Sequence, residues 1–232
     1  KVCAEAEKDP ENKYHHISQM DWANYCRCDN CAALDKKEGT PMGSVLYALN
    51  QVAERLAERH PGHKIETLAY TYTRQPPKHM KPTDNIAIKL CSIECDFSRP
   101  LNDPQSRDNR RFANDIRRWA KIAPRLHVWD YTTNFRNFQS PFPNFHVLQP
   151  NLQFFAEHNV KGMFEQGSYD RGAEFAPLRT YLISKLMWNP YADADAIMDE
   201  FLRLYYREAA PYIKEYIDLL TDRVNRDEVV MG

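Results

Sequence analysis

Acidic side chains recur directly after the β-rich runs of this sequence. Asp21 follows the first run, Glu94 and Asp96 follow the third, Asp130 lies near the end of the fourth, and Glu165 follows the fifth. Glycoside hydrolysis uses carboxyl groups in pairs, because one protonates the departing oxygen while the other activates water or attacks the sugar. Burial and neighbouring charge can give two such groups different pKa values. We therefore regard Asp21 as the candidate general acid, Glu165 or Asp130 as its partner, and Glu94 and Asp96 as alternates.

Aromatic rings and hydrogen-bonding side chains accompany these acids. Aromatic residues make up 12% of the chain, and Trp and Tyr rings can serve as apolar platforms for the C–H faces of a sugar. Amide and guanidinium groups bind hydroxyls or a substrate carboxylate. For Tyr70 and Tyr72, which share a face of the expected strand, packing inside a barrel is an alternative explanation. The expected substrate-binding residues are Tyr70, Tyr72, Arg74, Trp129, Tyr131, Asn134 and Gln166.

Each acid taken alone has a structural explanation, because Asp and Glu in loops commonly cap turns and helices. The recurrence of acids at successive strand ends is what favours a site, since parallel β/α folds gather their active sites at that edge. No Gly-rich phosphate loop, Rossmann fingerprint or serine nucleophile elbow is present, and the chain has only 7 Gly. We therefore expect no nucleotide and no other cofactor.

Charge and hydropathy exclude two classes of partner. The net charge is −1, and the basic residues are interspersed with acids, so no patch for nucleic acid stands out. No apolar run approaches the roughly 20 residues that a membrane helix needs. The expected partner is a carbohydrate substrate, with neither nucleic acid nor a membrane.

Five of the six cysteines fall into two groups along the sequence. Cys26, Cys28 and Cys31 form a C-x-C-x-x-C sequence, and Cys91 and Cys95 form a second group. With a fourth donor such as Cys95, the first group could hold structural zinc, although the paired C-x-x-C spacing usual for zinc is absent. In an oxidising compartment the same residues could form one or two disulfides. Free buried thiols are the third alternative, and sequence cannot fix the pairing. No metal ligand is assigned.

The elements that must position these residues alternate between short β-rich runs and segments of helical period. Strands are expected at residues 14–20, 65–72, 86–91, 126–131 and 160–164. One helix ends at Asp9–Pro10, one starts at Ser44 as N-cap, one ends near Pro124, and one opens at Pro150. Three more follow at about residues 177–188, 193–206 and 211–224. Residues 21–40 are expected to form a polar loop. The apolar spacing around Trp119 and Trp188 predicts that both side chains lie in the core.

Strands alternating with helices predict an α/β fold with a parallel sheet. Five units cannot close an eight-stranded barrel, so either about three units precede them or the sheet is open and doubly wound. We favour the first alternative, since the chain starts inside a helix and without Met. Residues 1–232 are then the C-terminal portion of a TIM-type (β/α)8 barrel, with helices from about residue 176 packing on it. The upstream remainder of the parent polypeptide would be its partner.

An ordered series of stretches resembles the bacterial family known as domain of unknown function 4838. The series comprises residues 18–21, 26–31, 67–70, 76–77, 129–131, 141–144 and 186–190, over nearly the whole chain. The resemblance implies secreted or periplasmic proteins related in fold to α-glucuronidases and β-hexosaminidases. It therefore implies an extracytoplasmic location, which favours disulfides over zinc. Only Asp21 stands where hexosaminidases carry an Asp-Glu pair, which argues against substrate-assisted chemistry.

The sequence thus predicts a glycoside hydrolase that acts on a polysaccharide or oligosaccharide through paired carboxylates. A fragment bearing uronic acid is one candidate substrate. The alternative is a non-catalytic carbohydrate-binding or scaffold domain that keeps the barrel without its chemistry.

Overall fold

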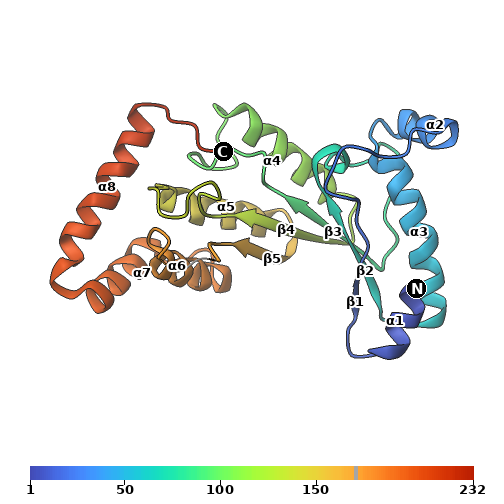
Figure 1. Ribbon diagram of the computed structural model, residues 1–232, viewed down its shortest axis with the longest axis horizontal. Coiled ribbons are helices and arrows are strands. Elements are labelled where there is room, and N and C mark those ends of the chain that lie inside the picture. Colours follow the sequence, from blue (N-terminus) through green and yellow to red (C-terminus); the bar gives the residue numbers. More distant parts are fainter. Residues whose placement is uncertain (170–171) are drawn as a thin grey trace. The chain divides into compact units, whose positions relative to one another are not determined.

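The computed structural model describes residues 1–169 and 172–232. Its central element is a sheet of five parallel strands in the order β1-β2-β3-β4-β5. Neighbours in sequence are therefore neighbours in the sheet, which is the order of a β/α barrel. The fold is an α/β partial barrel, as predicted. The strands are β1 (Tyr14–His16), β2 (Lys64–Ala69), β3 (Ile86–Cys91), β4 (Arg125–Tyr131) and β5 (Val160–Gln166) (Figure 1).

Helices fill the connections and the C-terminal part of the chain. They are α1 (Val2–Lys8), α2 (Asp29–Glu38), α3 (Met42–Arg59), α4 (Arg107–Trp119), α5 (Phe145–Glu157), α6 (Ala176–Trp188), α7 (Ala194–Phe201) and α8 (Ala210–Arg226). Three short turns are η1 (Thr71–Thr73), η2 (Leu202–Tyr206) and η3 (Arg207–Ala209). Over the two described ranges, every helix is too short or too polar to cross a membrane.

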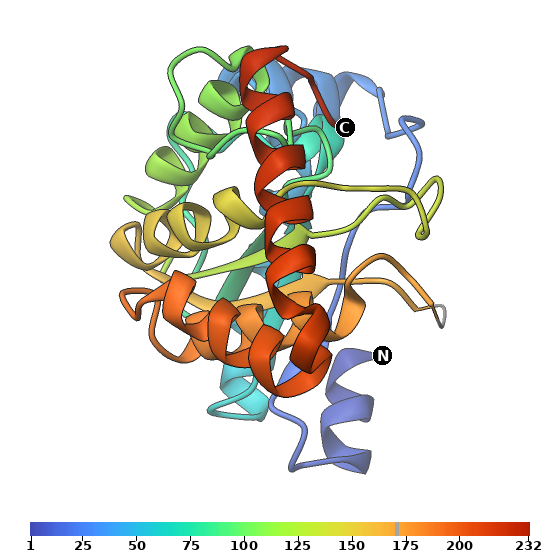
Figure 2. The same ribbon diagram turned by 90° about the vertical axis from the view of Figure 1, so that its left-hand side faces the viewer.

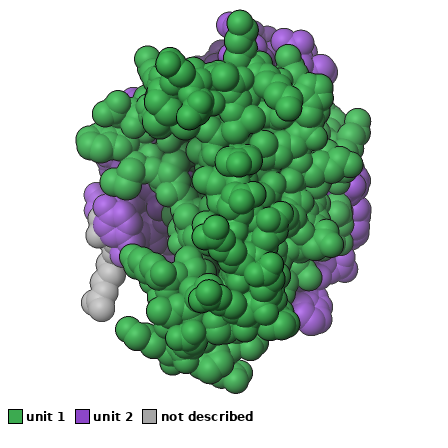
Figure 3. Space-filling model, turned by 90° about the vertical axis from the view of Figure 1, so that its right-hand side faces the viewer, with its two compact units in different colours: residues 1–91, 114–129, 159–163 green, residues 92–113, 130–158, 164–232 purple. Residues whose placement is uncertain are grey.

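The chain divides into two compact units, coloured separately in Figure 3. Unit 1 comprises residues 1–91, 114–129 and 159–163, and it contains β1 to β3 with most of β4. Unit 2 comprises residues 92–113, 130–158 and 164–232, and it contains the last residues of β4 and β5 with the loops that follow them.

Alternate burial in unit 1 shows how the sheet is covered. In β2 the side chains of Ile65, Thr67 and Ala69 are buried, whereas the residues between them are partly exposed. Helix α3 lies beside β2 and buries Leu46, Leu49, Ala53 and Leu56 (Figure 1). These positions recur at helical spacing, so burial of that apolar face stabilises the helix on the sheet.

Unit 2 is mainly helical. Helix α6 contacts α7, and α8 contacts the η2 turn that follows α7 (Figure 2). Leu178, Leu182 and Leu186 are buried along one face of α6. Asp193 is the N-cap of α7, and its Oδ1 accepts a hydrogen bond from the Ala196 N–H at 2.9 Å. The predicted start of this helix at about residue 193 is confirmed.

The predicted polar loop between β1 and α3 contains a helix, α2. This helix is polar and buries little except Glu38, so its sequence lacks an apolar period. It ends at Gly39, whose φ of 73° is the left-handed conformation that glycine adopts readily. The predicted N-cap of the next helix is also wrong, because α3 begins before Ser44. The Ser44 N–H donates to Asp35 Oδ1 at 2.7 Å, so a carboxylate from α2 takes the capping role.

The prediction that Tyr72 lies on a strand is wrong. β2 ends at Ala69, and Tyr72 belongs to the 3₁₀ turn η1. Thr73 Oγ1 accepts from the Tyr70 N–H at 3.1 Å, and Gln19 Nε2 donates to the Tyr70 carbonyl at 2.8 Å. These side chains satisfy the backbone groups of Tyr70, so the chain turns here. Likewise β1 ends at His16 rather than at residue 20.

Two expectations about helices are also wrong. Helix α5 begins at Phe145, so Pro150 lies inside it rather than in its first turn. Asn144, the N-cap residue, accepts a hydrogen bond from Arg179 and donates to the Thr132 carbonyl at 3.3 Å, which fixes the earlier start. Trp188 is the last residue of α6 and is 92% exposed. Trp119, in contrast, is fully buried as predicted.

Candidate functional site

Unit 2 contains two of the predicted acids on adjacent strands. Asp130 and Glu165 are the penultimate residues of β4 and β5. Asp130 is buried and accepts a hydrogen bond from the Ser92 hydroxyl. Glu165 is partly exposed as a residue, but its Oε1 is buried and has no hydrogen-bond partner within the described ranges. We call Asp130 and Glu165 the carboxyl pair.

Burial and mutual repulsion set the protonation of the carboxyl pair. Burial raises the pKa of Glu165 well above its usual range, and the negative charge of Asp130 raises it further. Burial also raises the pKa of Asp130, although hydrogen bonds from the Ser92 hydroxyl and the Tyr131 N–H oppose that rise. The hydrogen bond from Ser92 favours the ionised form of Asp130. As the pH rises, Asp130 therefore loses its proton before Glu165 does. The pair can therefore present an acid and a carboxylate at the same pH.

Four aromatic rings form a continuous row in unit 2, from the end of β4 to the loop after β5. Tyr131 contacts Phe135 with ring centroids 5.6 Å apart, Phe135 contacts Phe138 at 5.7 Å, and Phe138 contacts Tyr169 at 4.9 Å. Tyr169 is 82% exposed. This aromatic row (Tyr131, Phe135, Phe138 and Tyr169) offers ring surface to a ligand. The site residues predicted from sequence omitted Phe135 and Phe138, although the sequence is rich in Phe at this point.

Other predicted acids in unit 2 lie in the loop after β3. Asp96 is buried, and its Oδ1 accepts from the backbone N–H groups of Ser98 at 2.9 Å and Met231 at 3.2 Å. These bonds give Asp96 a capping role that fixes the loop. Glu94 is exposed in the same loop.

The predicted amide residues of unit 2 also have structural contacts. Asn134 Oδ1 accepts from the N–H groups of Arg136 at 3.0 Å and Asn137 at 3.2 Å, which closes a turn. The Gln166 carbonyl accepts from both the N–H and the hydroxyl of Thr132 at 3.1 Å. Their positions at the ends of β4 and β5 agree with the sequence reading.

Asp21, the predicted general acid, is exposed in a bend of unit 1 after β1. Its charge acts on Cys91, the last residue of β3. Burial raises the pKa of the Cys91 thiol to about 12, and the negative charges of Asp21 and Glu66 contribute to that rise.

The predicted substrate-binding residues of unit 1 have defined neighbours. Tyr72 stacks on Tyr25 with ring centroids 4.6 Å apart, and burial raises the pKa of the Tyr72 hydroxyl. Arg74 Nε donates to Asp115 Oδ2 at 2.9 Å, and the Arg74 carbonyl accepts from Trp119 Nε1 at 2.7 Å. Tyr70 and Trp129 are half-buried at the ends of β2 and β4.

A charged network that the sequence reading missed crosses the sheet of unit 1. Glu66 of β2 accepts from Lys89 Nζ of β3 at 2.6 Å, and its other oxygen lies 2.7 Å from His127 Nδ1 of β4. His16 Nδ1 of β1 lies 3.5 Å from Glu66 Oε2. Burial opposes ionisation of Glu66, but the contacts with His127, His16 and Lys89 hold its pKa well below the usual range. A Cβ atom on Gly162 of β5 would come within 3.1 Å of the His127 ring.

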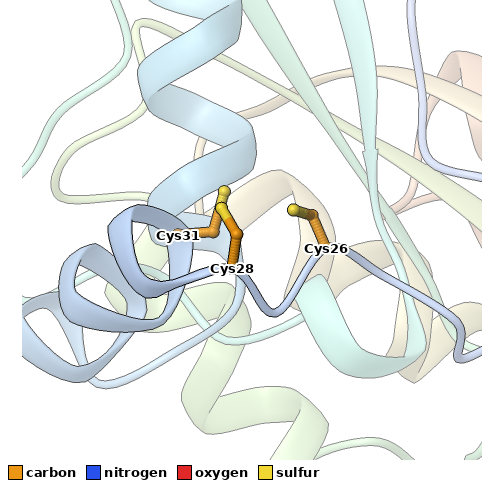
Figure 4. Close-up of side chains that lie close together, drawn as sticks. All are labelled: Cys26, Cys28 and Cys31. Carbon is orange, nitrogen blue, oxygen red and sulfur yellow. The ribbon is translucent and has the colours of Figure 1, made fainter.

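Three thiols gather at the start of α2 in unit 1. The Sγ atoms of Cys26, Cys28 and Cys31 all lie within 4.8 Å of one another, with the Cys26 sulfur turned toward the other two (Figure 4). Cys91 and Cys95 are buried. All six cysteines lie in described segments, and no disulfide joins them there.

Unit 2 also has a hollow of about 860 Å³. Most of its larger lining residues are aromatic, and the described residues around it supply no carboxyl group. They include Phe175, Tyr181, Phe201, Tyr205 and Tyr206. The hollow is therefore not the candidate catalytic site.

The parallel strands in chain order and the acids at their ends define the molecule as a β/α partial-barrel protein. The chain belongs to the family described as Domain of unknown function (DUF4838), whose model matches residues 1–218. The resemblance seen in the sequence is thereby confirmed. Comparison with curated proteins and comparison with solved structures gave no match.

Proposed function

We propose that the protein is a glycoside hydrolase in which the carboxyl pair takes part in catalysis. The observation that carries the proposal is the pair itself, since two acids of adjacent strand ends interact in a buried setting that keeps one of them protonated. Ordinary loop acids are solvated and ionise near their usual pKa. A buried acid beside a second carboxyl group is instead the arrangement that glycosidases use.

In this proposal Glu165 is the proton donor. It transfers its proton to the glycosidic oxygen as the bond between that oxygen and the anomeric carbon breaks. Asp130 is the ionised partner, and its negative charge stabilises the positive charge that develops on the sugar ring. Water then adds to the anomeric carbon, and its proton restores the acid form of Glu165.

The aromatic row supports a carbohydrate as the substrate class. Its rings continue from Tyr131, the residue next to Asp130, to the exposed Tyr169. Exposed rings in a row bind the apolar faces of successive sugar units at little cost in side-chain entropy. A polysaccharide or oligosaccharide therefore fits this surface better than a small charged metabolite. Asp21 stays a separate candidate for the general acid.

The experiment compares Glu165→Gln and Asp130→Asn with the unsubstituted protein on oligosaccharides, including fragments that bear uronic acid, and on 4-nitrophenyl glycosides. We expect Glu165→Gln to lower kcat on oligosaccharides at least about 100-fold, because general acid catalysis contributes that much or more. The loss should be far smaller on 4-nitrophenyl glycosides, since nitrophenolate leaves without protonation. Glu157→Gln, at an exposed carboxylate in α5, is the matched control and should leave kcat unchanged.

Four outcomes would contradict the proposal. Turnover that survives both substitutions removes the carboxyl pair from catalysis, and loss of turnover in Asp21→Asn alone would transfer the acid role to Asp21. Calorimetric binding of sugars without any turnover would identify a carbohydrate-binding domain. Neither binding nor turnover would identify a scaffold.

A further inference from the structure

The C-x-C-x-x-C sequence forms a compact group of donors that the carboxyl-pair chemistry does not use. Cys28 is the N-cap of α2, Cys31 lies in the first turn of that helix, and Cys26 lies two residues before the cap. The three Sγ atoms are within 4.8 Å of one another, and the Cys26 sulfur points toward the other two (Figure 4).

The spacing of the sulfurs fits one thiophilic metal ion. With a Zn–S bond of about 2.3 Å, the sulfurs of a tetrahedral site lie roughly 3.8 Å apart, so side-chain shifts of about 1 Å would close the group around an ion. Thiolates select zinc, copper(I) and related soft ions over magnesium or calcium. The first turn of α2 also favours negative charge, because its backbone N–H groups point toward the N-terminus.

The convergence of all three thiols distinguishes a metal site from a disulfide. A disulfide joins two sulfurs and gives the third no reason to approach them, whereas a metal ion binds all three. Cys26 and Cys28 are exposed, so an ion can enter from solvent. Among described residues the group comprises only these three donors. A fourth position is therefore left for water or another small ligand.

We propose that Cys26, Cys28 and Cys31 bind a single thiophilic ion, represented by Zn²⁺, through three thiolates. The ion joins the end of the irregular segment 17–28 to the first turn of α2. That segment carries Asp21, Trp22 and Tyr25, and the Tyr25 ring stacks on Tyr72 and lies under the Arg27 guanidinium at 5.1 Å. Metal binding therefore orders the segment, and this role does not depend on the proposed hydrolase activity.

The test uses the full chain, purified without chelator. Elemental analysis should find about one Zn²⁺ per chain, and Co²⁺ replacement should give the near-ultraviolet thiolate-to-metal absorption of a three-sulfur site. Substitution of Cys26, Cys28 or Cys31 by Ser should raise the Kd for Zn²⁺ by at least about 100-fold, because loss of a direct ligand exceeds the loss of a supporting residue. Cys3→Ser is the control, since the Cys3 thiol lies outside the group, and it should leave the Kd unchanged.

A second readout follows from the position of Arg27 between two of the ligands. Zn²⁺ should slow tryptic cleavage after Arg27 at least about tenfold, and Cys28→Ser should abolish that protection.

The extracytoplasmic location implied by the family resemblance would instead favour oxidation of the three thiols. A disulfide among the three cysteines in the isolated protein overturns the proposal, as does failure of the reduced protein to bind Zn²⁺ or Co²⁺. Measurements of Zn²⁺ content and of hydrolysis are independent, so failure of one proposal can be told from failure of the other.

Discussion

The Ser92 hydroxyl donates a hydrogen bond to the Asp130 carboxylate, which links the residue directly after β3 to the penultimate residue of β4. The bond favours the ionised form of Asp130 and opposes the rise in pKa that burial causes. Ser92 was not among the residues predicted from the sequence. It nevertheless helps to decide which member of the carboxyl pair loses its proton first.

Ser92→Ala should shift the pH dependence of hydrolysis. Loss of the hydrogen bond raises the pKa of Asp130, so the acidic limb of the kcat/KM profile should move to higher pH by about half to one unit. Ser98→Ala is the matched control, because Ser98 is buried in the same loop but bonds to Asp96. A reduced kcat/KM with an unmoved acidic limb would show that Ser92 has only a structural role.

Glu165→Gln should change stability in a pH-dependent way. The folded-state pKa of Glu165 lies above its unfolded value, so its favourable contribution is complete below about pH 4.3 and is lost as pH rises through the folded pKa. The free energy of unfolding of Glu165→Gln, relative to the unsubstituted protein, should therefore rise by about 1–3 kcal/mol between pH 4 and pH 7. Urea unfolding at both pH values measures it. A difference independent of pH would refute the assigned shift.

Glu66→Gln should show the opposite trend. Its contacts with His127, His16 and Lys89 lower the folded-state pKa, so its contribution is present above about pH 4.3 and is lost as pH falls through that lowered pKa. The substitution should cost about 1–3 kcal/mol at pH 7, and less below pH 4. Urea unfolding of Glu58→Gln, an exposed carboxylate on α3, gives the baseline. Equal costs for the two variants at pH 7 would contradict the network.

The two tryptophans provide a stability test of the core assignment. Trp119→Ala should cost about 3–5 kcal/mol, because it opens a cavity and removes a hydrogen bond to the Arg74 carbonyl. Trp188→Ala should change stability by less than about 0.5 kcal/mol, because the side chain is almost wholly exposed. Thermal unfolding of both variants measures these two changes in stability. A large cost at Trp188 would mean that its ring is covered in solution.

Periodicity in the sequence predicted the five strands and most helices, because alternating and helical apolar spacing reflect burial directly. Helix α2 was missed since it buries little, and its start depends on a cysteine at the N-cap. Trp188 was misplaced because it continues the apolar spacing of α6 beyond the last buried leucine. Spacing alone does not show where a core ends.

The candidate site was predictable only in part. The order of the strands placed Asp130 and Glu165 at adjacent strand ends. The raised pKa of Glu165, however, depends on burial, which no sequence pattern shows. The Glu66 network depends on strand register, which pairs Lys89 with His127 and Glu66 with His16. Register follows from the contacts of whole strands, so these four residues gave no joint signal in the sequence.

Gly162 gives the charged network of unit 1 a steric requirement. The hydrogen atom in place of a side chain leaves the space that the His127 ring occupies, and a methyl group would come within 3.1 Å of that ring. Gly162→Ala alters no charge and no hydrogen-bonding group, yet the imidazole would have to move by a few tenths of an ångström, which would disturb its contact with the Glu66 carboxylate. The electrostatics of the sheet are thus set partly by the smallest uncharged residue in it.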